Sequence, residues 1–268
     1  MPKHPGYWGK LLRVNLSTRD MKEEDLSKKF LKRYLGGAGF TTKLLYDEVD
    51  ETTDPLGPEN VLIIAPGMLV GPNVPTASKT SIGFKSPVTS GYGKSIVGAK
   101  LGDQLKRAGY DVLIVEGKAK YPTLIVINDG KVKLEDATDL WGLDTRETDG
   151  MIKQEYDGYS TATIGPAGEN LSKLAMIECE DRQAGKGGGG TVMGSKNLKA
   201  IAAKGSELPP VHDKERLDEL NDKWMKETTG RGETEISGTG SATVDMQYGT
   251  GEALHVKNRE LGMFPTRN

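Results

Sequence analysis

The glycine content of this chain is the feature that most limits what it can fold into. Glycine accounts for 35 of the 268 residues, against an average usage of roughly 7%. Apolar runs typical of buried strands separate the glycines, at residues 60–65, 111–116 and 123–128 (NVLIIA, DVLIVE and TLIVIN). Glycine is needed where the backbone turns tightly or lies close to another group. The pattern therefore predicts a strand-rich fold with close backbone approaches.

The remaining elements place most of this fold in residues 1–208. Further strands are expected at 10–15 and 198–203, and helices at 25–34, 97–107 and 144–155. Asp129-Gly130, between two apolar runs, predicts a two-residue hairpin turn. We interpret 1–208 as one mixed, largely antiparallel α+β domain.

A domain boundary is expected at Leu208-Pro209-Pro210, because the prolines interrupt regular structure. Beyond it, residues 213–226 predict a charged helix, and a polar stretch rich in Gly, Ser and Thr follows. Residues 209–268 are interpreted as a linker and the beginning of a second, helical domain.

Charge and hydropathy exclude two classes of function. Lys and Arg number 36 and Asp and Glu 38, so the chain lacks the basic balance of a nucleic-acid-binding protein. No apolar run approaches the roughly 20 residues that span a bilayer. The first residues contain no apolar signal-peptide core. We expect a cytoplasmic protein that binds neither nucleic acid nor membrane.

Potential metal ligands are sparse. Cys179 is the only cysteine, and His4, His212 and His255 are far apart in the sequence. No disulfide, zinc or iron–sulfur site can be assembled from one thiol. We expect no metal bound through side chains of this chain, and no catalytic residue stands out.

Two glycine-rich segments are candidates for anion binding. One is 91–102, which contains Gly91-Tyr92-Gly93-Lys94-Ser95 and Gly98, and the other is 182–188 (RQAGKGG). Both place basic side chains beside glycines just before an expected helix. Backbone N–H groups at such a place suit phosphate, and glycine allows the ligand to approach them.

Nucleotide-binding motifs explain these segments less well. Gly185-x-Gly187-x-x-Gly190 matches a dinucleotide fingerprint, but a run of four glycines matches it almost automatically. The alternating strand–helix units of a Rossmann sheet are also lacking. Gly93-Lys94-Ser95 ends like a Walker A motif, but Val88 stands where its first glycine is required.

Several segments together resemble the aldehyde ferredoxin oxidoreductase family, in the family's order and over roughly residues 7–205. They are 8–18 (WGKLLRVNLST), 34–39 (YLGGAG), 54–60 (DPLGPEN), 85–87 (KSP), 108–119 (AGYDVLIVEGKA), 164–170 (IGPAGEN) and 182–200 (RQAGKGGGGTVMGSKNLKA). Residues 261–268 (LGMFPTRN) resemble the family's entry into its next domain.

The resemblance implies a base domain of two related β-sheets with flanking helices. Across it lies a bis-pyranopterin cofactor that carries tungsten, or molybdenum, with magnesium bridging its two phosphates. The family's pterin contacts fall here at Lys79, Gly98, Arg182, Gln183, Gly185 and Lys186. Gln183 is expected to contribute chiefly its backbone.

Three positions depart from the family pattern. Lys79 and Lys186 stand where the family often has arginine, and lysine cannot bind a phosphate in a bidentate manner. Ile96 stands where the family commonly has an asparagine associated with magnesium. Either the carbonyl of Ile96 serves instead, or the magnesium is arranged differently.

The activity implied is oxidation of aldehydes to carboxylic acids, with ferredoxin as electron acceptor. The resemblance also implies a homodimer. The cysteines of its [4Fe–4S] cluster, and the acid and histidine near the metal, belong to helical domains that would follow Asn268. These 268 residues alone are therefore expected to be inactive without a cluster-binding half or subunit. The alternatives are a subunit of a related class II benzoyl-coenzyme A reductase, a non-catalytic pterin-binding or assembly module, and a remnant that binds nothing.

Overall fold

The chain divides into two compact units, Met1–His212 and Asp213–Asn268. The computed structural model describes residues 4–72 and 74–229. In the second unit it describes the helix α7 (Lys214–Thr229), which carries ion pairs between Lys214 and Asp218 and between Arg216 and Glu219. The helix predicted over 213–226 is confirmed, and the predicted features at 230–268 lie outside the described residues.

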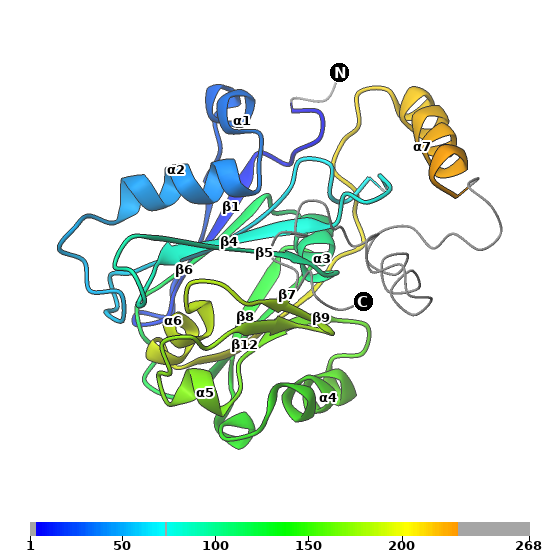
Figure 1. The fold of residues 1–268 in the computed structure, drawn as a ribbon. Coiled ribbons are helices and arrows are strands. Elements are labelled where there is room, and N and C mark those ends of the chain that lie inside the picture. Colours follow the sequence, from blue (N-terminus) through cyan, green and yellow to red (C-terminus); the bar gives the residue numbers. More distant parts are fainter. Residues whose placement is uncertain (1–3, 73, 230–268) are drawn as a thin grey trace, which may run out of the picture. The chain divides into compact units, whose positions relative to one another are not determined.

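Two six-stranded sheets form the described part of the first unit (Figure 1). The strands of the first sheet are β1 (Lys10–Asn15), β2 (Met21–Asp25), β3 (Leu62–Pro66), β4 (Lys79–Lys85), β5 (Tyr92–Gly98) and β6 (Val112–Glu116). The strands of the second are β7 (Thr123–Asn128), β8 (Lys131–Asp136), β9 (Ser160–Thr163), β10 (Ile177–Cys179), β11 (Arg182–Ala184) and β12 (Leu198–Lys204).

The two sheets share one topology. Their strand orders are β2-β1-β6-β3-β4-β5 and, read from the matching end, β8-β7-β12-β9-β10-β11. Each consists of a hairpin, a three-stranded meander and a last strand inserted between them. The inserted strand runs parallel to the hairpin and antiparallel to the meander. The predicted mixed, largely antiparallel α+β fold with two related sheets is confirmed: each sheet has one parallel pair, and its other pairs are antiparallel.

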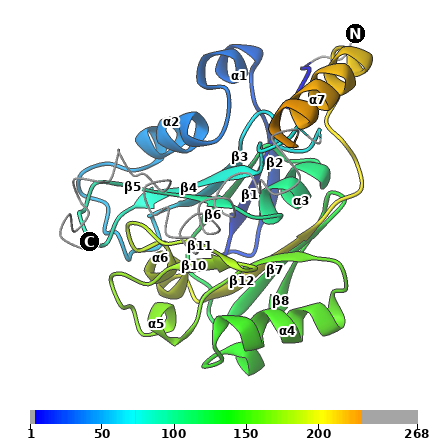
Figure 2. The same cartoon turned by 45° about the vertical axis from the view of Figure 1, so that its right-hand side comes forward.

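The helices form layers above, between and below the sheets (Figure 1, Figure 2). They are α1 (Lys28–Tyr34), α2 (Ala38–Glu48), α3 (Leu101–Arg107), the 3-10 turn η1 (Thr138–Leu140), α4 (Thr145–Glu155), α5 (Pro166–Glu169) and α6 (Gly189–Ser195). Helices α1 and α2 cover the outer face of the first sheet, and α4 that of the second. Helices α3 and α6 contact strands of both sheets, and each connects a meander to its inserted strand.

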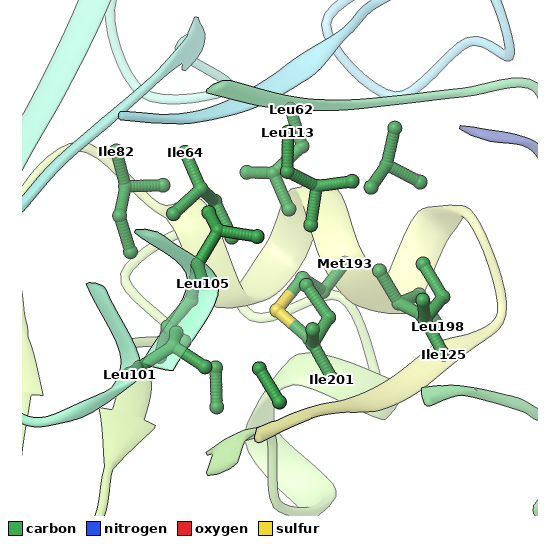
Figure 3. Close-up of a cluster of buried hydrophobic side chains, with 14 of the residues drawn as sticks. Leu62, Ile64, Ile82, Leu101, Leu105, Leu113, Ile125, Met193, Leu198 and Ile201 are labelled. Carbon is green, nitrogen blue, oxygen red and sulfur yellow. The ribbon is translucent and has the colours of Figure 1, made fainter. Parts of the chain in front are cut away.

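Apolar side chains fill the space between the sheets (Figure 3). The first sheet contributes Leu62, Ile64, Ile82 and Leu113, the second Ile125, Leu198 and Ile201, and the helices Leu101, Leu105 and Met193. All are at most 2% exposed. Removal of this apolar surface from water is the main force that holds the two sheets together.

The glycines of α6 allow the helix to pack closely on its neighbours. A Cβ at Gly190 would lie 2.3 Å from the carbonyl oxygen of Met176, and one at Gly194 would lie 1.9 Å from that of Gly168. Both distances are far below van der Waals contact, so no larger residue fits. The glycine run that matched a dinucleotide fingerprint is therefore explained largely by helix packing.

Buried lysines bind loop carbonyls inside the first unit. Lys196 donates from Nζ to the carbonyl of Gly117 at 3.0 Å, and Lys106 donates to that of Met68 at 3.1 Å. Lys106 also lies 3.6 Å from the buried carboxylate of Asp111. Desolvation lowers the pKa of Lys106 and raises the pKa of Asp111. These ammonium groups satisfy carbonyls that would otherwise be buried without a partner.

Two predicted helices begin later than expected. Residues 97–98 end strand β5, and the helix starts only at Leu101; Asp25 ends β2, and α1 starts at Lys28. In β5, Gly93, Ser95 and Val97 face inward while the residues between them are exposed, which is the period of a strand and not of a helix. The Asp129-Gly130 turn and the N-cap at Asp144 are confirmed.

Substitution of two helical glycines by alanine should change stability in opposite directions. Gly194→Ala should lower the free energy of unfolding by about 2 kcal/mol or more, because its methyl group overlaps the backbone of α5. Gly150→Ala in α4 has nothing within 4 Å and should raise it by about 0.5–1 kcal/mol. Urea denaturation measures both, and a Gly194→Ala protein as stable as the wild type would contradict the packing of α6 on α5.

Lys196 should make stability depend on pH in the alkaline range. Burial lowers the pKa of Lys196 to about 8, against an ordinary value of 10.5. Between these values the unfolded chain holds a proton that the folded chain has lost, so stability should rise with pH. Relative to Lys196→Met, the free energy of unfolding of the wild type should rise by about 2–3 kcal/mol between pH 7.5 and 10.5. Chemical denaturation measures this. If the difference in unfolding free energy between the two proteins stayed constant across that range, the pKa of Lys196 would not be lowered in the folded state.

Candidate functional site

The edge strands β5 and β11 of the two sheets come together at the predicted site residues. The backbone N–H of Lys186 donates to Ser95 Oγ at 3.1 Å, and Ser86 Oγ donates to the carbonyl of Gly187 at 2.8 Å. These two bonds fasten the connection from β11 to α6 against the end of the first sheet.

Lys79 and Gly98 face each other across β4 and β5. The ammonium of Lys79 lies over Gly98, since a Cβ there would be 3.0 Å from Nζ. The side chain of Lys79 is exposed. Glycine at position 98 thus leaves room for this charge beside the backbone.

Arg182 and Gln183 lie on opposite faces of β11. Gln183 pairs with Glu178, whose carboxylate accepts a hydrogen bond from Thr145 at the start of α4 at 3.0 Å. The side chain of Gln183 therefore lies on the α4 side, and that of Arg182 on the side that faces the first sheet. This agrees with a backbone role for Gln183.

A cavity of about 730 Å³ lies beside these strands. Of the six predicted residues, only Gly98 and Arg182 line it; Lys79 on β4, Gln183 on β11, and Gly185 and Lys186 in the connection after β11 lie outside its lining. Other lining residues include Ser78, Lys100, Asp103, Arg107, Glu180 and Asp181. Arg107 donates to Asp103 at 2.7 Å.

Five exposed cations lie on β4, β5, β11 and the connections that follow β5 and β11, and two of them, Lys100 and Arg182, line the same cavity. The five are Lys79, Lys94, Lys100, Arg182 and Lys186. Within residues 4–72 and 74–229, none of these side chains makes a hydrogen bond or an ion pair. By contrast, Arg13 on β1 is bound by three glutamates. Unpaired cations beside glycine fit a ligand that carries phosphate.

The shared topology of the sheets makes two parts of this site equivalent. Gly98 is the last residue of β5, directly before the connection to α3, and Gly185 is the first residue of the connection from β11 to α6. A lysine follows each glycine closely, Lys100 in the first connection and Lys186 in the second. The fold therefore presents two similar glycine–lysine positions at the adjoining edges of the sheets.

The prediction that both glycine-rich segments directly precede a helix is wrong for the first segment. Gly91–Ser95 forms a turn and the start of β5 and does not precede a helix directly. At α6, the N–H of Gly190 donates to the carbonyl of Ala175, and Gly188–Gly190 are buried. Burial keeps these glycines from a ligand, whereas Gly185 and the side chain of Lys186 in that connection are exposed.

Lys94 and Lys100 both lie in the glycine-rich segment 91–102 that the sequence indicates for anion binding, but neither is among the six cofactor contacts that the family resemblance implies. The signal for Lys94 is the alternation over 92–98, which places it on the same face as Ile96 and Gly98. A helix predicted from residue 97 interrupts this two-residue alternation, which in the structure continues to Gly98. Lys100 is the counterpart of Lys186, which only the sheet topology reveals.

Side chains that commonly bind metals do not cluster in the described part of the chain. No group of three or more His, Cys, Asp or Glu among them could hold a metal ion. Cys179 is buried, and burial raises the pKa of its thiol to about 12. None of the described helices is long and apolar enough to cross a membrane.

Residues 11–205 match the family described as aldehyde ferredoxin oxidoreductase, N-terminal domain. The chain belongs to this family. It is 41% identical over 267 residues to the tungsten-containing aldehyde ferredoxin oxidoreductase of Pyrococcus furiosus, which covers 98% of this chain and 43% of that protein. The aliphatic sulfonate oxidoreductase, WOR-like subunit, of the same organism is 38% identical over 281 residues and is covered to 43%.

A solved structure agrees with this assignment. The active site complex BamBC of benzoyl coenzyme A reductase, in complex with 1,5-dienoyl-CoA, superposes with a TM-score of 0.81 at 33% identity. The match covers 87% of this chain and 36% of that chain. The chain thus spans well under half the length of these relatives.

The hydrogen bond from Lys186 to Ser95 should contribute to the local order of the site. Ser95→Ala should lower the free energy of unfolding by about 1 kcal/mol and speed amide exchange at residues 185–187, because the N–H of Lys186 loses its acceptor. Denaturation and hydrogen exchange measure the two effects. Ser172→Ala is the control: Ser172 is exposed and its side chain makes no bond in the described region, so unchanged exchange in Ser95→Ala would contradict the role of this bond.

Proposed function

We propose that this chain binds the bis-pyranopterin cofactor of a tungsten-dependent (or molybdenum-dependent) oxidoreductase. The observation that carries the proposal is the pair of glycine–lysine positions at the corresponding ends of β5 and β11, with exposed cations on these strands and on β4 that make no ion pair within the described residues. A cofactor with two phosphate-bearing pterins needs two such positions close together. Family membership supports the same ligand.

The cofactor would be held by the residues that the family resemblance indicated. They are Lys79, Gly98, Arg182, Gln183, Gly185 and Lys186. Lys79, Arg182 and Lys186 would neutralise phosphate charge, and the glycines would let the cofactor approach the backbone. When bound, the metal centre supplies the redox chemistry, while this domain binds and orients the cofactor.

Magnesium that bridges the phosphates would have to use oxygen atoms from the cofactor, the backbone or water. Ile96 is 49% exposed on β5, and its apolar side chain is no ligand for a hard cation. The carbonyl of Ile96 is the group at this position that could take the place of an asparagine.

The reaction proposed for the whole enzyme is oxidation of aldehydes to carboxylic acids, with ferredoxin as electron acceptor. In this proposal residues 1–208 are the base domain, and 209–268 are a linker and the beginning of a helical domain. The [4Fe–4S] cluster and the residues next to the metal belong to a further half or subunit, so this chain alone is inactive. The enzyme is a cytoplasmic homodimer.

A second candidate function is that of a subunit of a class II benzoyl-coenzyme A reductase. The structural similarity to the BamBC complex favours it. Co-expression with the cluster-binding partner separates the candidates: aldehyde-dependent dye reduction supports the first, and turnover of an aromatic coenzyme A thioester supports the second. Bound pterin with neither activity would indicate a non-catalytic binding or assembly module.

Cofactor retention should depend on Arg182. In protein co-expressed with its partner, Arg182→Ala should lower the pterin content at least about fivefold, because a charged contact to phosphate is lost. Fluorescence of the oxidised pterin and elemental analysis for tungsten measure this. Arg146→Ala, which removes an exposed arginine from α4, should leave the content unchanged. Equal pterin content in both variants would contradict the assignment of Arg182, and a wild type without pterin would contradict the proposed function.

A further inference from the structure

The turn between β10 and β11 places a carboxylate inside the proposed anion site. Glu180 and Asp181 form this turn, directly before Arg182, and all three residues line the 730 Å³ cavity. A carboxylate at this place repels a phosphate, so its presence needs a physical reason.

Glu180 adopts a backbone conformation that costs energy. Its φ is 58°, in the left-handed region that residues with a Cβ rarely occupy. Glycine or asparagine would fit this turn with less strain. Strained residues are commonly retained where their side chain has a task.

The side chain of Glu180 reaches the connection from β5 to α3, which belongs to the first sheet. Its Oε2 accepts a hydrogen bond from the backbone N–H of Lys100 at 3.2 Å. Lys100 follows Gly98 in the connection from β5 to α3, and its ammonium is one of the five exposed cations. The carboxylate thus occupies an N–H group beside Gly98, Lys100 and Arg182, which is where an anionic ligand would be bound.

We propose that Glu180 is an internal competitor for the anion site. Its carboxylate occupies the Lys100 amide in the free protein and gives way to a phosphate group when the ligand binds. The inference rests on the proposed function, because the ligand it concerns is the phosphate of the cofactor. Glu180 would make the site selective, since a weakly held monoanion cannot displace it while a ligand with several negative charges can.

The test uses inorganic pyrophosphate and the full chain without cofactor. Glu180→Gly removes the carboxylate and relieves the strained φ, so the variant should fold well. Isothermal titration calorimetry should show that it binds pyrophosphate about five- to tenfold more tightly than the wild type. If the bond to Lys100 only held the turn in place, the same substitution would loosen the site and weaken binding.

Asp181→Asn is the matched control, because Asp181 lies on the same turn and lines the same cavity. It makes no hydrogen bond to Lys100 within the described residues, so its substitution reduces repulsion alone and should tighten binding clearly less than Glu180→Gly does. Hydrogen exchange at the Lys100 amide gives a second readout: it should be faster in free Glu180→Gly and slow again with pyrophosphate.

The outcomes separate this inference from the proposed function. Binding of pyrophosphate to Glu180→Gly that is no tighter than to the wild type, or equal gains in Glu180→Gly and Asp181→Asn, would overturn the competitor role. Tighter binding in Glu180→Gly by a protein that retains no pterin on co-expression would support the role of Glu180 while contradicting the cofactor assignment.

Discussion

The close packing of α3 and α6 between the two sheets is the interaction on which the rest of the structure depends. The apolar side chains of these helices and of both inner sheet faces form one core, which brings the edges β5 and β11 together. Helix α6 lies directly against the backbone of α5 and of the segment before β10. Side chains would not fit at these contacts, and glycines stand there. The position of the site is therefore a result of core packing and not of local sequence.

Lysines that are buried inside the first unit complement this core. Lys85, Lys106, Lys196 and Lys199 each donate to backbone carbonyls of loops that are distant in sequence. A long apolar stem with a charged end can pass through the core and still reach polar atoms. The chain thus uses one residue type for two purposes: buried lysines join loops, and the exposed Lys79, Lys94, Lys100 and Lys186 lie at or near the edges that carry the proposed anion site.

The sequence allowed much of the fold to be predicted, for reasons that can be traced to particular elements. Apolar runs such as 123–128 and local signals such as Asp129-Gly130 and Asp144 act over a few residues, and the structure agrees with them. The strand at 92–98 was harder to predict, because its glycines and its exposed Lys94 and Ile96 weaken the apolar pattern. The equivalence of Lys100 and Lys186 could not be predicted from local sequence, since it depends on long-range strand pairing. The six site residues were indicated by family resemblance, and the structure shows how they are arranged on β4, β5, β11 and the connection to α6.

The repeated topology has a consequence for the direction in which a ligand can bind. Two sheets of the same strand order offer two corresponding positions, but their chemistry differs. One position has Gly98 with Lys79 beside it, and the other has Gly185, where a Cβ would lie 2.9 Å from the sulfur of Met176. A ligand built from two identical halves would meet unlike surroundings at each end. The protein would thereby distinguish two halves that are identical in the free molecule.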